Sequence, residues 1–365
     1  MDDLNEILKD KCRGCLVGGA VGDALGYAVE FMSEASIKKR YGARGITEYT
    51  LTNGVAEISD DTQMTLFTAG GLLLGADIKA GRDFVKRHSD NIALSYKDWY
   101  RTQTEKYPIK GKHYSCLLKH PELFDQRAPG GTCMSALSSL MKGVRGSISN
   151  PVNTSKGCGG VMRVAPIGVC FSGKAVKIEE IDMLAAEAAA ITHGHDLGYI
   201  PAAALAHIIH IISHRCDVSL ADAVNDMIRT MQRLFSEAKH ICDFTDLMRK
   251  AVDLSSRDIA DIDAIHILGE GWVAEETLAI AIYSALKYSN DFEGAMIAAV
   301  NHNGDSDSTG AVTGNILGAY LGMRAISRKY LDNLELKSVI LELSDALYNF
   351  TAAHELFENK RGGEI

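Results

Sequence analysis

The stretch Ile58-Ser59-Asp60-Asp61-Thr62-Gln63-Met64-Thr65 sets two adjacent carboxylates among hydroxyl groups, directly before an apolar segment that reads as a helix. Near the other end of the chain, Gly304-Asp305-Ser306-Asp307-Ser308-Thr309-Gly310 has a similar composition and also precedes a helix-like segment. Carboxylate and hydroxyl oxygens are hard ligands, which suit Mg²⁺, Ca²⁺ or Mn²⁺ rather than zinc or copper. Because Ser and Asp are also preferred helix N-caps, one such cluster is weak evidence. Two clusters that share Ser-Asp-x-Thr predict two halves of one metal site.

The second stretch allows two other interpretations. As an EF-hand loop with Asp305 at position 1, it would place Ile316 at position 12, which requires a bidentate glutamate, so an EF-hand is excluded. As the nucleophile loop of an aspartyl-phosphate phosphohydrolase, it would use Asp305 to attack phosphorus. Such loops follow a buried strand, whereas residues 295–302 have a helical pattern. The metal site is therefore the favoured interpretation.

Composition and charge limit the classes of partner. The chain has 365 residues, with 38 basic and 47 acidic side chains and a net charge of −9, which argues against a nucleic-acid-binding surface. The N-terminal segment Met1-Asp2-Asp3-Leu4-Asn5-Glu6 lacks the basic-then-apolar pattern of a secretory signal. The longest apolar run, from Ile200 to Ile212, is too short to span a bilayer. We therefore expect a cytoplasmic protein with no nucleic-acid partner and no membrane partner.

The hydrophobic pattern predicts an all-α fold. Apolar residues recur with the helical period, whereas the alternation typical of strands is scarce, and no linker interrupts the pattern. We expect one compact helical bundle, residues 1–365, in which abundant glycine and alanine allow close packing around a crowded centre. Residues 103–131 and 156–160 read as loops over the surface. The expected helices cover residues 4–20, 62–75, 82–102, 132–142, 179–192, 199–214, 219–238, 244–253, 274–288, 291–301, 309–323 and 335–352.

Two other groups of potential metal ligands are expected to be structural. His207, His210 and His214 lie on one helix face, but the isoleucines between them indicate a buried helix. Cys12 and Cys15 have C-x-x-C spacing inside a helical pattern, and no second pair follows at zinc-finger distance. We interpret all five as core or partly buried side chains.

Further segments could contact a ligand. Gly157-Cys158-Gly159-Gly160 presents backbone N–H groups that can hold phosphate oxygens, although a plain tight turn fits its composition equally well. His193 precedes a glycine break at a helix end, where ligand contact and a structural role are equally favoured. Asp125 or Arg127 could face a substrate from a rigid turn. Trp272 is either a stacking surface for a base or part of the core.

Together these segments resemble the ADP-ribosylglycohydrolase family, which includes the dinitrogenase reductase-activating glycohydrolase and the ADP-ribosylarginine hydrolases. The resemblance covers nearly the whole chain and implies an all-α, single-domain bundle with two Mg²⁺ or Mn²⁺ ions at its centre. It rests on these motifs in order: Gly22-Asp23-Ala24-Leu25-Gly26 with Val29-Glu30-Phe31, Ser59-Asp60-Asp61-Thr62, Arg127-Ala128-Pro129-Gly130-Gly131, Gly157-Cys158-Gly159-Gly160-Val161-Met162-Arg163, Thr192-His193, Gly271-Trp272-Val273-Ala274-Glu275-Glu276 and Gly304-Asp305-Ser306-Asp307-Ser308-Thr309.

The resemblance also implies a role for each site residue. Glu30 is the expected general acid/base, with Asp60, Asp61 and Asp125 as the other candidates. One ion would be bound by Ser59, Asp60 and Asp61, and the other by Asp305, Asp307 and Ser308, with Asp307 as the bridge. The implied substrate-binding residues are Asp125, Arg127, Gly130, Gly157, Cys158, Gly159, Gly160, His193 and Trp272. Among them the glycine-rich loop would hold the pyrophosphate, His193 the distal ribose or a phosphate, and Trp272 the adenosine side.

The implied reaction is hydrolysis at C1″ of the distal ribose, which releases ADP-ribose from a modified protein. The ions would orient the sugar and activate water, and carboxylates would stabilise the oxocarbenium-like transition state. Arg127-Ala128-Pro129-Gly130-Gly131 is similar to the arginine-directed branch of the family, so modified arginine is the expected substrate. Serine-linked ADP-ribose, O-acetyl-ADP-ribose and a non-catalytic ADP-ribose-binding relative are the alternatives.

Overall fold

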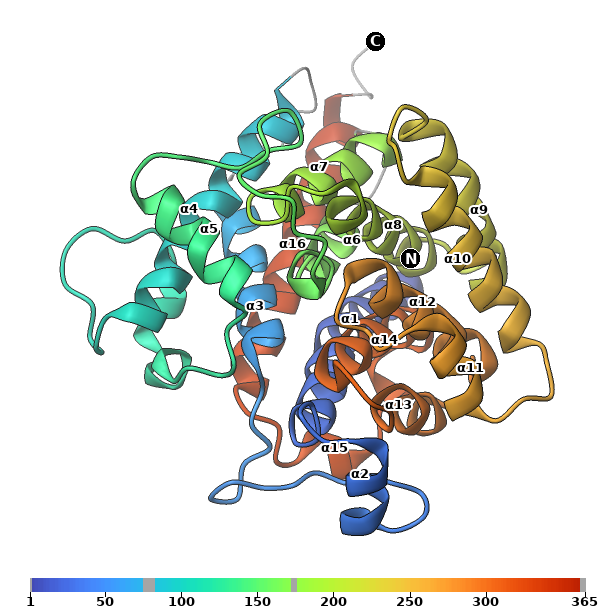
Figure 1. Cartoon of the computed structure of the whole chain (residues 1–365). Helices are drawn as coiled ribbons and strands as arrows, with labels where there is room; N and C mark the ends of the chain where they lie inside the picture. The colour runs from blue at the N-terminus through green and yellow to red at the C-terminus, as the bar shows by residue number, and fades with distance from the viewer. Residues whose placement is uncertain (1, 75–82, 172–175, 362–365) are drawn as a thin grey trace.

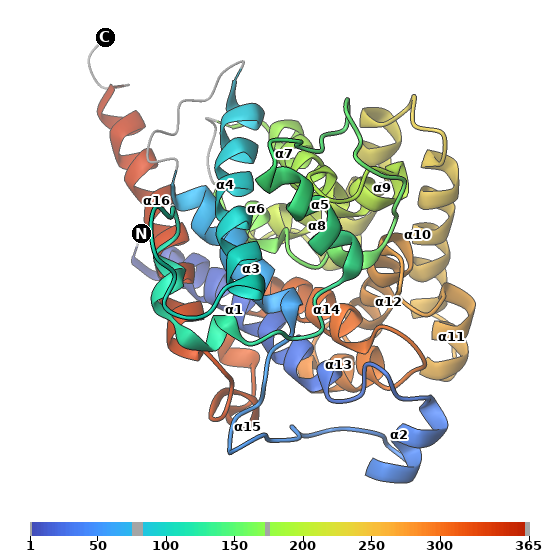
Figure 2. The same cartoon turned by 60° about the vertical axis from the view of Figure 1, so that its left-hand side comes forward.

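The chain folds into a bundle of helices, described here from a computed structural model (Figures 1 and 2). The described residues, 2–74, 83–171 and 176–361, form sixteen α-helices and four short 3-10 helices, and they contain no strand beyond isolated bridges. The all-α prediction is therefore confirmed. The α-helices are α1 (Asp2–Tyr27), α2 (Glu34–Tyr41), α3 (Asp60–Leu73), α4 (Phe84–Thr104), α5 (Gly131–Met141), α6 (Ala165–Cys170), α7 (Ile178–Ala190), α8 (Asp196–His214), α9 (Leu220–Leu234), α10 (Ile241–Ser255), α11 (Asp261–Leu268), α12 (Ala274–Lys287), α13 (Phe292–Val300), α14 (Ser306–Leu321), α15 (Arg328–Leu331) and α16 (Lys337–Arg361). The 3-10 helices are η1 (Cys116–Lys119), η2 (Pro121–Phe124), η3 (Cys158–Gly160) and η4 (Met323–Ala325).

The centre of the bundle is the packing of α1 against α14, two antiparallel helices from opposite ends of the chain (Figures 1 and 2). Glycines at every fourth position bring the two backbones into contact. A Cβ atom on Gly18 would lie 2.4 Å from the carbonyl oxygen of Gly314, and one on Gly22 would lie 2.0 Å from that of Gly310. The Asn315 side chain donates to the Cys15 carbonyl across the same contact, at 2.8 Å. The prediction of close packing around a crowded centre is therefore confirmed.

The helix α8 is a core helix. By length and composition it could cross a membrane, but 83% of its most apolar window is buried inside the protein. It packs against α6, α7 and α9, and the alanines of α7 and α8 are fully buried. The apolarity of α8 is therefore used to build the interior of the bundle.

Each of the twelve expected helices is present, with shifted ends, and four short helices were missed: α2, α6, α11 and α15. The helix predicted to end at residue 20 continues to Tyr27, because its glycines are needed against α14, and this packing outweighs their low helix propensity. The helix predicted to start at residue 309 starts at Ser306, with Asp305 as its N-cap. Residues 75 and 82, the expected ends of two helices, lie outside the described residues.

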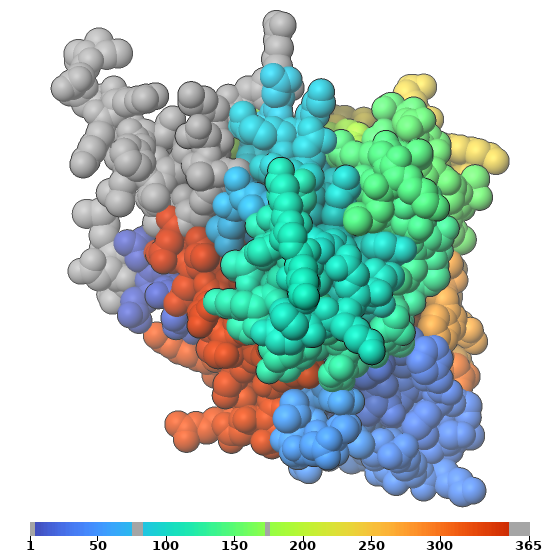
Figure 3. Space-filling model, turned by 90° about the vertical axis from the view of Figure 1, so that its left-hand side faces the viewer, coloured from blue at the N-terminus to red at the C-terminus, as the bar shows by residue number. Residues whose placement is uncertain are grey.

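The two segments predicted as surface loops behave differently. Residues between α4 and α5, in teal, cross the centre of the face in Figure 3, but the end of this segment returns to the interior, where the Arg127 carbonyl accepts from the Asp60 N–H at 3.0 Å. The prediction for residues 156–160 was wrong, because Gly159 and Gly160 are buried. A Cβ atom on Gly160 would lie 2.7 Å from the Gly198 carbonyl oxygen, so this position requires glycine for packing against α8.

The two groups of side chains predicted to be structural lie inside the fold. Cys12 and Cys15 are buried free thiols on α1. His207 is fully buried on α8, and its Nδ1 lies 3.0 Å from the Asp182 carboxylate. The sequence did not indicate this carboxylate partner, because it comes from the neighbouring helix α7.

Candidate active site

The structure brings together the two acidic stretches from opposite ends of the sequence. The helices α3 and α14 both begin at the same pocket, with Ser59 and Asp305 as their N-caps. The Ser59 hydroxyl accepts from the Asp61 N–H at 3.1 Å, which fixes the first turn of α3. The pocket has a volume of about 190 Å³. Its acidic and hydroxyl lining residues are Glu30, Asp60, Asp61, Thr132, Asp305, Asp307 and Ser308.

A further carboxylate, Asp23 on α1, holds this arrangement in place and was missing from the predicted site. Asp23 is fully buried, and its oxygens accept from the backbone N–H groups of Ser59 and Thr62 at 3.0 Å. It also accepts from the Thr62 hydroxyl. Asp23 therefore anchors the start of α3 to the central helix. The available signal was an acidic residue inside a segment that is otherwise small and apolar.

Asp307 is the charge at the centre of the carboxylate cluster. Burial, followed by the negative charge of Asp307, raises the pKa of each of its carboxylate neighbours; the value is about 7 for Asp23 and about 10 for Glu30. Burial also raises the pKa of Asp307 itself. The other carboxylates raised by burial and Asp307, well above their ordinary values, are Asp60, Asp61 and Asp305.

The residues present fit a divalent cation. Ligand oxygens of Glu30, Asp305 and Asp307 lie within 4.8 Å of one another. Two buried oxygens, Glu30 Oε2 and Asp61 Oδ2, have no hydrogen-bond partner. An unpaired buried carboxylate is costly, and a cation satisfies several at once. The all-oxygen donor set suits Mg²⁺ or Mn²⁺.

We expect Mg²⁺ to stabilise the folded protein, and to do so more strongly at alkaline pH. Without a cation, the raised pKa values mean that the folded state retains protons that the unfolded chain releases. The contribution of these protonated carboxyl groups to the free energy of unfolding is fully present below the ordinary carboxyl pKa. It is lost as the pH rises through about 7 for Asp23 and about 10 for Glu30. A bound cation offsets this loss because it favours the ionised carboxylates. Thermal unfolding at about pH 5.5 and about pH 8.5, with Mg²⁺ and with EDTA, should show a rise in Tm that is larger at the higher pH, by about 3 °C or more.

Two variants make this measurement specific to the pocket. Asp305→Asn should lose most of the Mg²⁺ response, whereas Asp217→Asn, which changes an exposed carboxylate, should keep it. A response that is absent in the unmodified protein, or that survives in Asp305→Asn, would show that this cluster is not the cation site.

One wall of the pocket is the glycine-rich loop. Gly157, Cys158 and Gly159 line the pocket, and the Cys158 thiol donates to Asp305 Oδ2 at 2.8 Å. A Cβ atom on Gly159 would lie 2.9 Å from His193 Cε1, so no side chain fits between the loop and this ring. Gly160 lies behind the loop and is not part of the lining. The N–H groups of Gly157 and Cys158 donate to the Ser155 hydroxyl and the Trp272 carbonyl, so the loop leaves Gly159 and the His193 ring at the pocket wall.

His193 is held as a neutral ring. The buried Arg163 guanidinium donates to the Thr192 hydroxyl at 2.7 Å, and this hydroxyl lies 2.8 Å from His193 Nδ1. Burial and the positive charge of Arg163 lower the pKa of His193 to about 3. The Thr192 hydroxyl can donate either to His193 Nδ1 or to the Ala189 carbonyl at 3.4 Å, and Nε2 of the neutral ring faces the glycine loop.

Two aromatic rings lie at the mouth of the pocket. Trp272 lines the pocket and is 40% exposed, and Phe31, next to Glu30 in sequence, is 74% exposed. The rings are stacked with centroids 6.2 Å apart and planes 22° apart. Exposed parallel rings of this kind form a surface for a planar or cationic group.

Three predicted substrate contacts lie in different surroundings. Gly130 lines the pocket, and its N–H donates to Asp60 Oδ2 at 3.3 Å. Arg127 and Asp125 are not among the lining residues. Arg127 is nearly buried and forms ion pairs with Glu57 at 2.8 Å and Glu335 at 3.1 Å. The Asp125 side chain is 69% exposed, 3.4 Å from Arg127.

The predicted metal ligand Ser59 is fully buried at the start of α3 and is not among the residues that line the pocket.

Comparisons with known proteins agree over nearly the whole chain. The sequence model of the ADP-ribosylglycohydrolase family matches residues 4–356. An uncharacterized protein of Archaeoglobus fulgidus is 28% identical, over 93% of this chain and 97% of its own. ADP-ribosylhydrolase ARH3 of Mus musculus is 23% identical, over 88% and 87%, and the ADP-ribosyl-dinitrogen reductase glycohydrolase of Rhodospirillum rubrum is 24% identical, over 90% and 91%. A solved ADP-ribosylglycohydrolase-related protein complex shares the fold, with a TM-score of 0.60, 24% identity and coverage of 95% and 99%.

Proposed function

The chain belongs to the ADP-ribosylglycohydrolase family, and we propose that it hydrolyses the bond between C1″ of ADP-ribose and a modified protein side chain, with arginine as the leading acceptor. The observation that carries this proposal is the meeting of buried carboxylates from both ends of the chain at one pocket. Their number and their partnerless oxygens support a catalytic protein over a relative that only binds ADP-ribose. A phosphohydrolase reaction at Asp305 is disfavoured, because this residue follows the helix α13 and not a buried strand.

Two divalent ions, Mg²⁺ or Mn²⁺, are the proposed cofactors. The residues that would hold them are Ser59, Asp60, Asp61, Asp305, Asp307 and Ser308, with Asp307 between the two. When bound, such ions supply positive charge, a template for sugar hydroxyls and a lowered pKa of water. Asp23 would act indirectly, because its hydrogen bonds to Ser59 and Thr62 set the position of the first turn of α3.

We assign proton transfer to Glu30. Its Oε2 atom has no hydrogen-bond partner, and the residue lines the pocket beside Asp305 and Asp307. It is therefore free to move a proton to or from the acceptor atom at C1″. Asp60 and Asp61 are buried and line the same pocket as Glu30. Their negative charge would stabilise the positive character that develops at C1″.

The remaining lining residues would hold the rest of ADP-ribose. The N–H groups of Gly157 and Cys158 already donate to the Ser155 hydroxyl and the Trp272 carbonyl, so the Gly159 N–H and Nε2 of His193 are the groups that we assign to pyrophosphate oxygens. Because the low pKa of His193 keeps the ring neutral, its charge is unchanged over the whole physiological pH range.

The preference for arginine rests on the aromatic pair at the pocket mouth. The ion pairs of Arg127 hold the Arg-Ala-Pro-Gly-Gly segment in place, so this segment does not itself support an acceptor contact. Trp272 lines the same pocket as the carboxylates and stacks on Phe31, so we assign this pair to a planar guanidinium and not to the adenosine side that the resemblance implies. Serine-linked and O-acetyl-ADP-ribose lack that group and are the alternative substrates.

A side-by-side assay tests the proposed function. Protein or peptide carrying ADP-ribose on arginine, serine or cysteine, and O-acetyl-ADP-ribose, are each incubated with the protein and Mg²⁺, and free ADP-ribose is measured. We expect release from arginine to be fastest. Binding without release would favour the non-catalytic alternative, and release of inorganic phosphate would favour the phosphohydrolase alternative.

Trp272→Ala should raise KM for the arginine-linked substrate by about threefold to tenfold, with a small change in kcat, because a stacking contact is lost equally in ground and transition states. Trp272→Phe keeps an aromatic ring and should remain close to the unmodified protein. KM for the serine-linked substrate should be nearly unchanged. An equal rise for every substrate would show that Trp272 contacts the ADP-ribose part and not the acceptor.

A further inference from the structure

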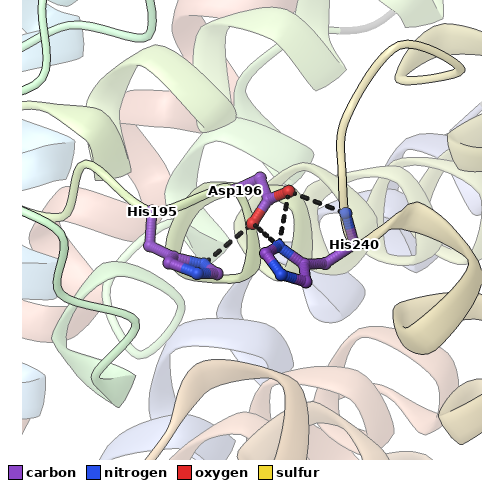
Figure 4. Close-up of side chains that lie close together, drawn as sticks. All are labelled: His195, Asp196 and His240. Atoms are coloured by element: carbon purple, nitrogen blue, oxygen red, sulfur yellow. Dashed lines mark hydrogen bonds and ion pairs between the residues drawn. The ribbon is translucent and has the colours of Figure 1, made fainter.

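A second group of metal-ligating side chains lies outside the candidate active site. His195 and Asp196 stand at the start of α8, and His240 directly precedes α10 (Figure 4). The Nδ1 atoms of His195 and His240 lie 2.8 Å and 2.9 Å from the same oxygen, Asp196 Oδ1. One ligand atom from each residue lies within 4.8 Å of the others. The three side chains therefore converge on a single point.

This group borders its own cavity. His195 and His240 line a space of about 610 Å³, which also contains the carboxylates of Asp243 and Asp246. None of its lining residues lines the pocket that contains Asp305 and Asp307. A cation at His195 and His240 would have room for water ligands, in a cavity whose lining combines the carboxylates of Asp243, Asp246 and Glu275 with the side chains of Lys156 and Lys250. It would also be separate from the carboxylate centre.

His195 Nδ1 and Asp196 Oδ1 are close enough to share either a proton or a metal ion. The Leu197 N–H lies 3.0 Å from His195 Nδ1, an arrangement that requires a lone pair on this nitrogen. That lone pair would also face Asp196 Oδ1 at 2.8 Å, where two acceptors repel unless a proton or a metal ion lies between them. Leu197 N–H has a second acceptor available, Asp196 Oδ1 at 2.9 Å. The backbone hydrogen bond therefore survives when His195 Nδ1 binds something else.

We propose that His195, Asp196 and His240 bind a zinc ion. Two imidazoles and one carboxylate are a nitrogen-and-oxygen donor set that suits Zn²⁺, and three protein ligands leave an open position for water. This set differs from the all-oxygen carboxylate centre, which suits Mg²⁺ or Mn²⁺. Binding would require the Nδ1 lone pair of each ring to face the ion, with the ring proton on Nε2.

Forming this site would require the ligand atoms to move. Ligand atoms bound tetrahedrally at about 2.0 Å lie roughly 3.3 Å apart, so the two nitrogen-to-oxygen separations of 2.8 Å and 2.9 Å need to widen by a few tenths of an ångström, and the two Nδ1 atoms, which lie within 4.8 Å of each other, need to reach the same spacing. Both rings are partly exposed and stack on each other, at 4.8 Å between centroids. The His240 backbone N–H also donates to Asp196 Oδ2 at 2.9 Å, which fixes the orientation of this carboxylate and does not use a ring nitrogen.

Zinc at this position would join the starts of two helices and brace the candidate active site. The His195 N–H donates to the Ser155 carbonyl at 3.2 Å, and Ser155 directly precedes the glycine-rich loop region. His193, which lines the active-site pocket, is two residues before His195. The ion would therefore hold α8, α10 and the loop in one arrangement.

Calorimetric titration of Zn²⁺ into Mg²⁺-saturated protein tests this proposal. We expect one tight site per chain, and an affinity at least about tenfold weaker in His240→Ala and in His195→Asn. Asparagine at 195 retains a side chain that can cap α8, so this variant remains informative if His240→Ala fails to fold. His113→Ala, which changes an exposed histidine in the segment between α4 and α5, is the matched control and should bind Zn²⁺ normally. Co²⁺ provides a second readout, because its absorption bands report tetrahedral nitrogen and oxygen ligands.

Three results would overturn the proposal: no tight Zn²⁺ binding, unchanged affinity in both histidine variants, or loss of Zn²⁺ binding in Asp307→Asn with the histidine variants intact. The last result would place the ion at the carboxylate centre. In the first two cases His195, Asp196 and His240 would be a hydrogen-bonded cap of α8 and α10. None of these outcomes depends on turnover of ADP-ribosylated protein.

Discussion

Asp307→Asn is expected to abolish turnover while the protein stays folded. Asp307 lines the same pocket as the carboxylates of both acidic stretches, and its negative charge raises the pKa of each of them. Asparagine keeps the shape but removes the charge that would hold a cation. We expect kcat/KM for ADP-ribose release to fall by about 1,000-fold or more, equivalent to about 4 kcal/mol of transition-state stabilisation. Asp60→Ala should have a comparable effect.

Circular dichroism separates loss of chemistry from loss of structure. The helical signal of Asp307→Asn should match that of the unmodified protein, because the carboxylate is part of a repulsive cluster and its removal relieves buried charge. Asp217→Asn, at an exposed position, is the matched control and should retain full activity. Full activity in Asp307→Asn would contradict the assignment of the catalytic centre.

Gly18→Ala is expected to destabilise the fold by about 3 kcal/mol, at the upper end of typical overpacking effects. A Cβ atom at this position would lie 2.4 Å from the Gly314 carbonyl oxygen, and backbone atoms cannot move aside as a flexible side chain can. The helices α1 and α14 would have to separate. Because Asp23 is on α1 and Asp307 is on α14, the carboxylate cluster would be displaced together with them.

Urea unfolding followed by circular dichroism measures this effect. Gly131→Ala is the matched control, because no atom lies within 4 Å of the added Cβ at the start of α5, and it should change stability by less than about 1 kcal/mol. If Gly18→Ala is as stable as Gly131→Ala, the two helices are not held at the close approach described here.

The sequence was sufficient to predict most of the fold, because helical periodicity is local and strong over the long elements. Its errors have physical causes. The end of α1 was missed because glycine has low helix propensity, and the need for Gly22 and Gly26 against α14 is a long-range effect. Short helices such as α11 and α15 contain too few turns to show a period.

The candidate site was predictable where its residues cluster in sequence, as at Asp60-Asp61 and Asp305-Ser306-Asp307. Asp23 was not assigned, because its role is to accept from backbone N–H groups on another helix. Arg127 looked like a substrate contact because its partners, Glu57 and Glu335, come from distant segments. The pairing of His240 with Asp196 could not be predicted from the sequence either, because the two residues are 44 positions apart.

The contact between α1 and α14 also has a consequence for biosynthesis. It joins distant residues such as Cys15 and Asn315, 300 positions apart, so the first helix leaves the ribosome long before its partner has been translated. Until then the glycine-lined face of the first helix has no complement, and the nascent chain cannot complete the carboxylate cluster. Premature termination anywhere before α14 would therefore yield a polypeptide without its central helix pair and without the second half of the carboxylate cluster.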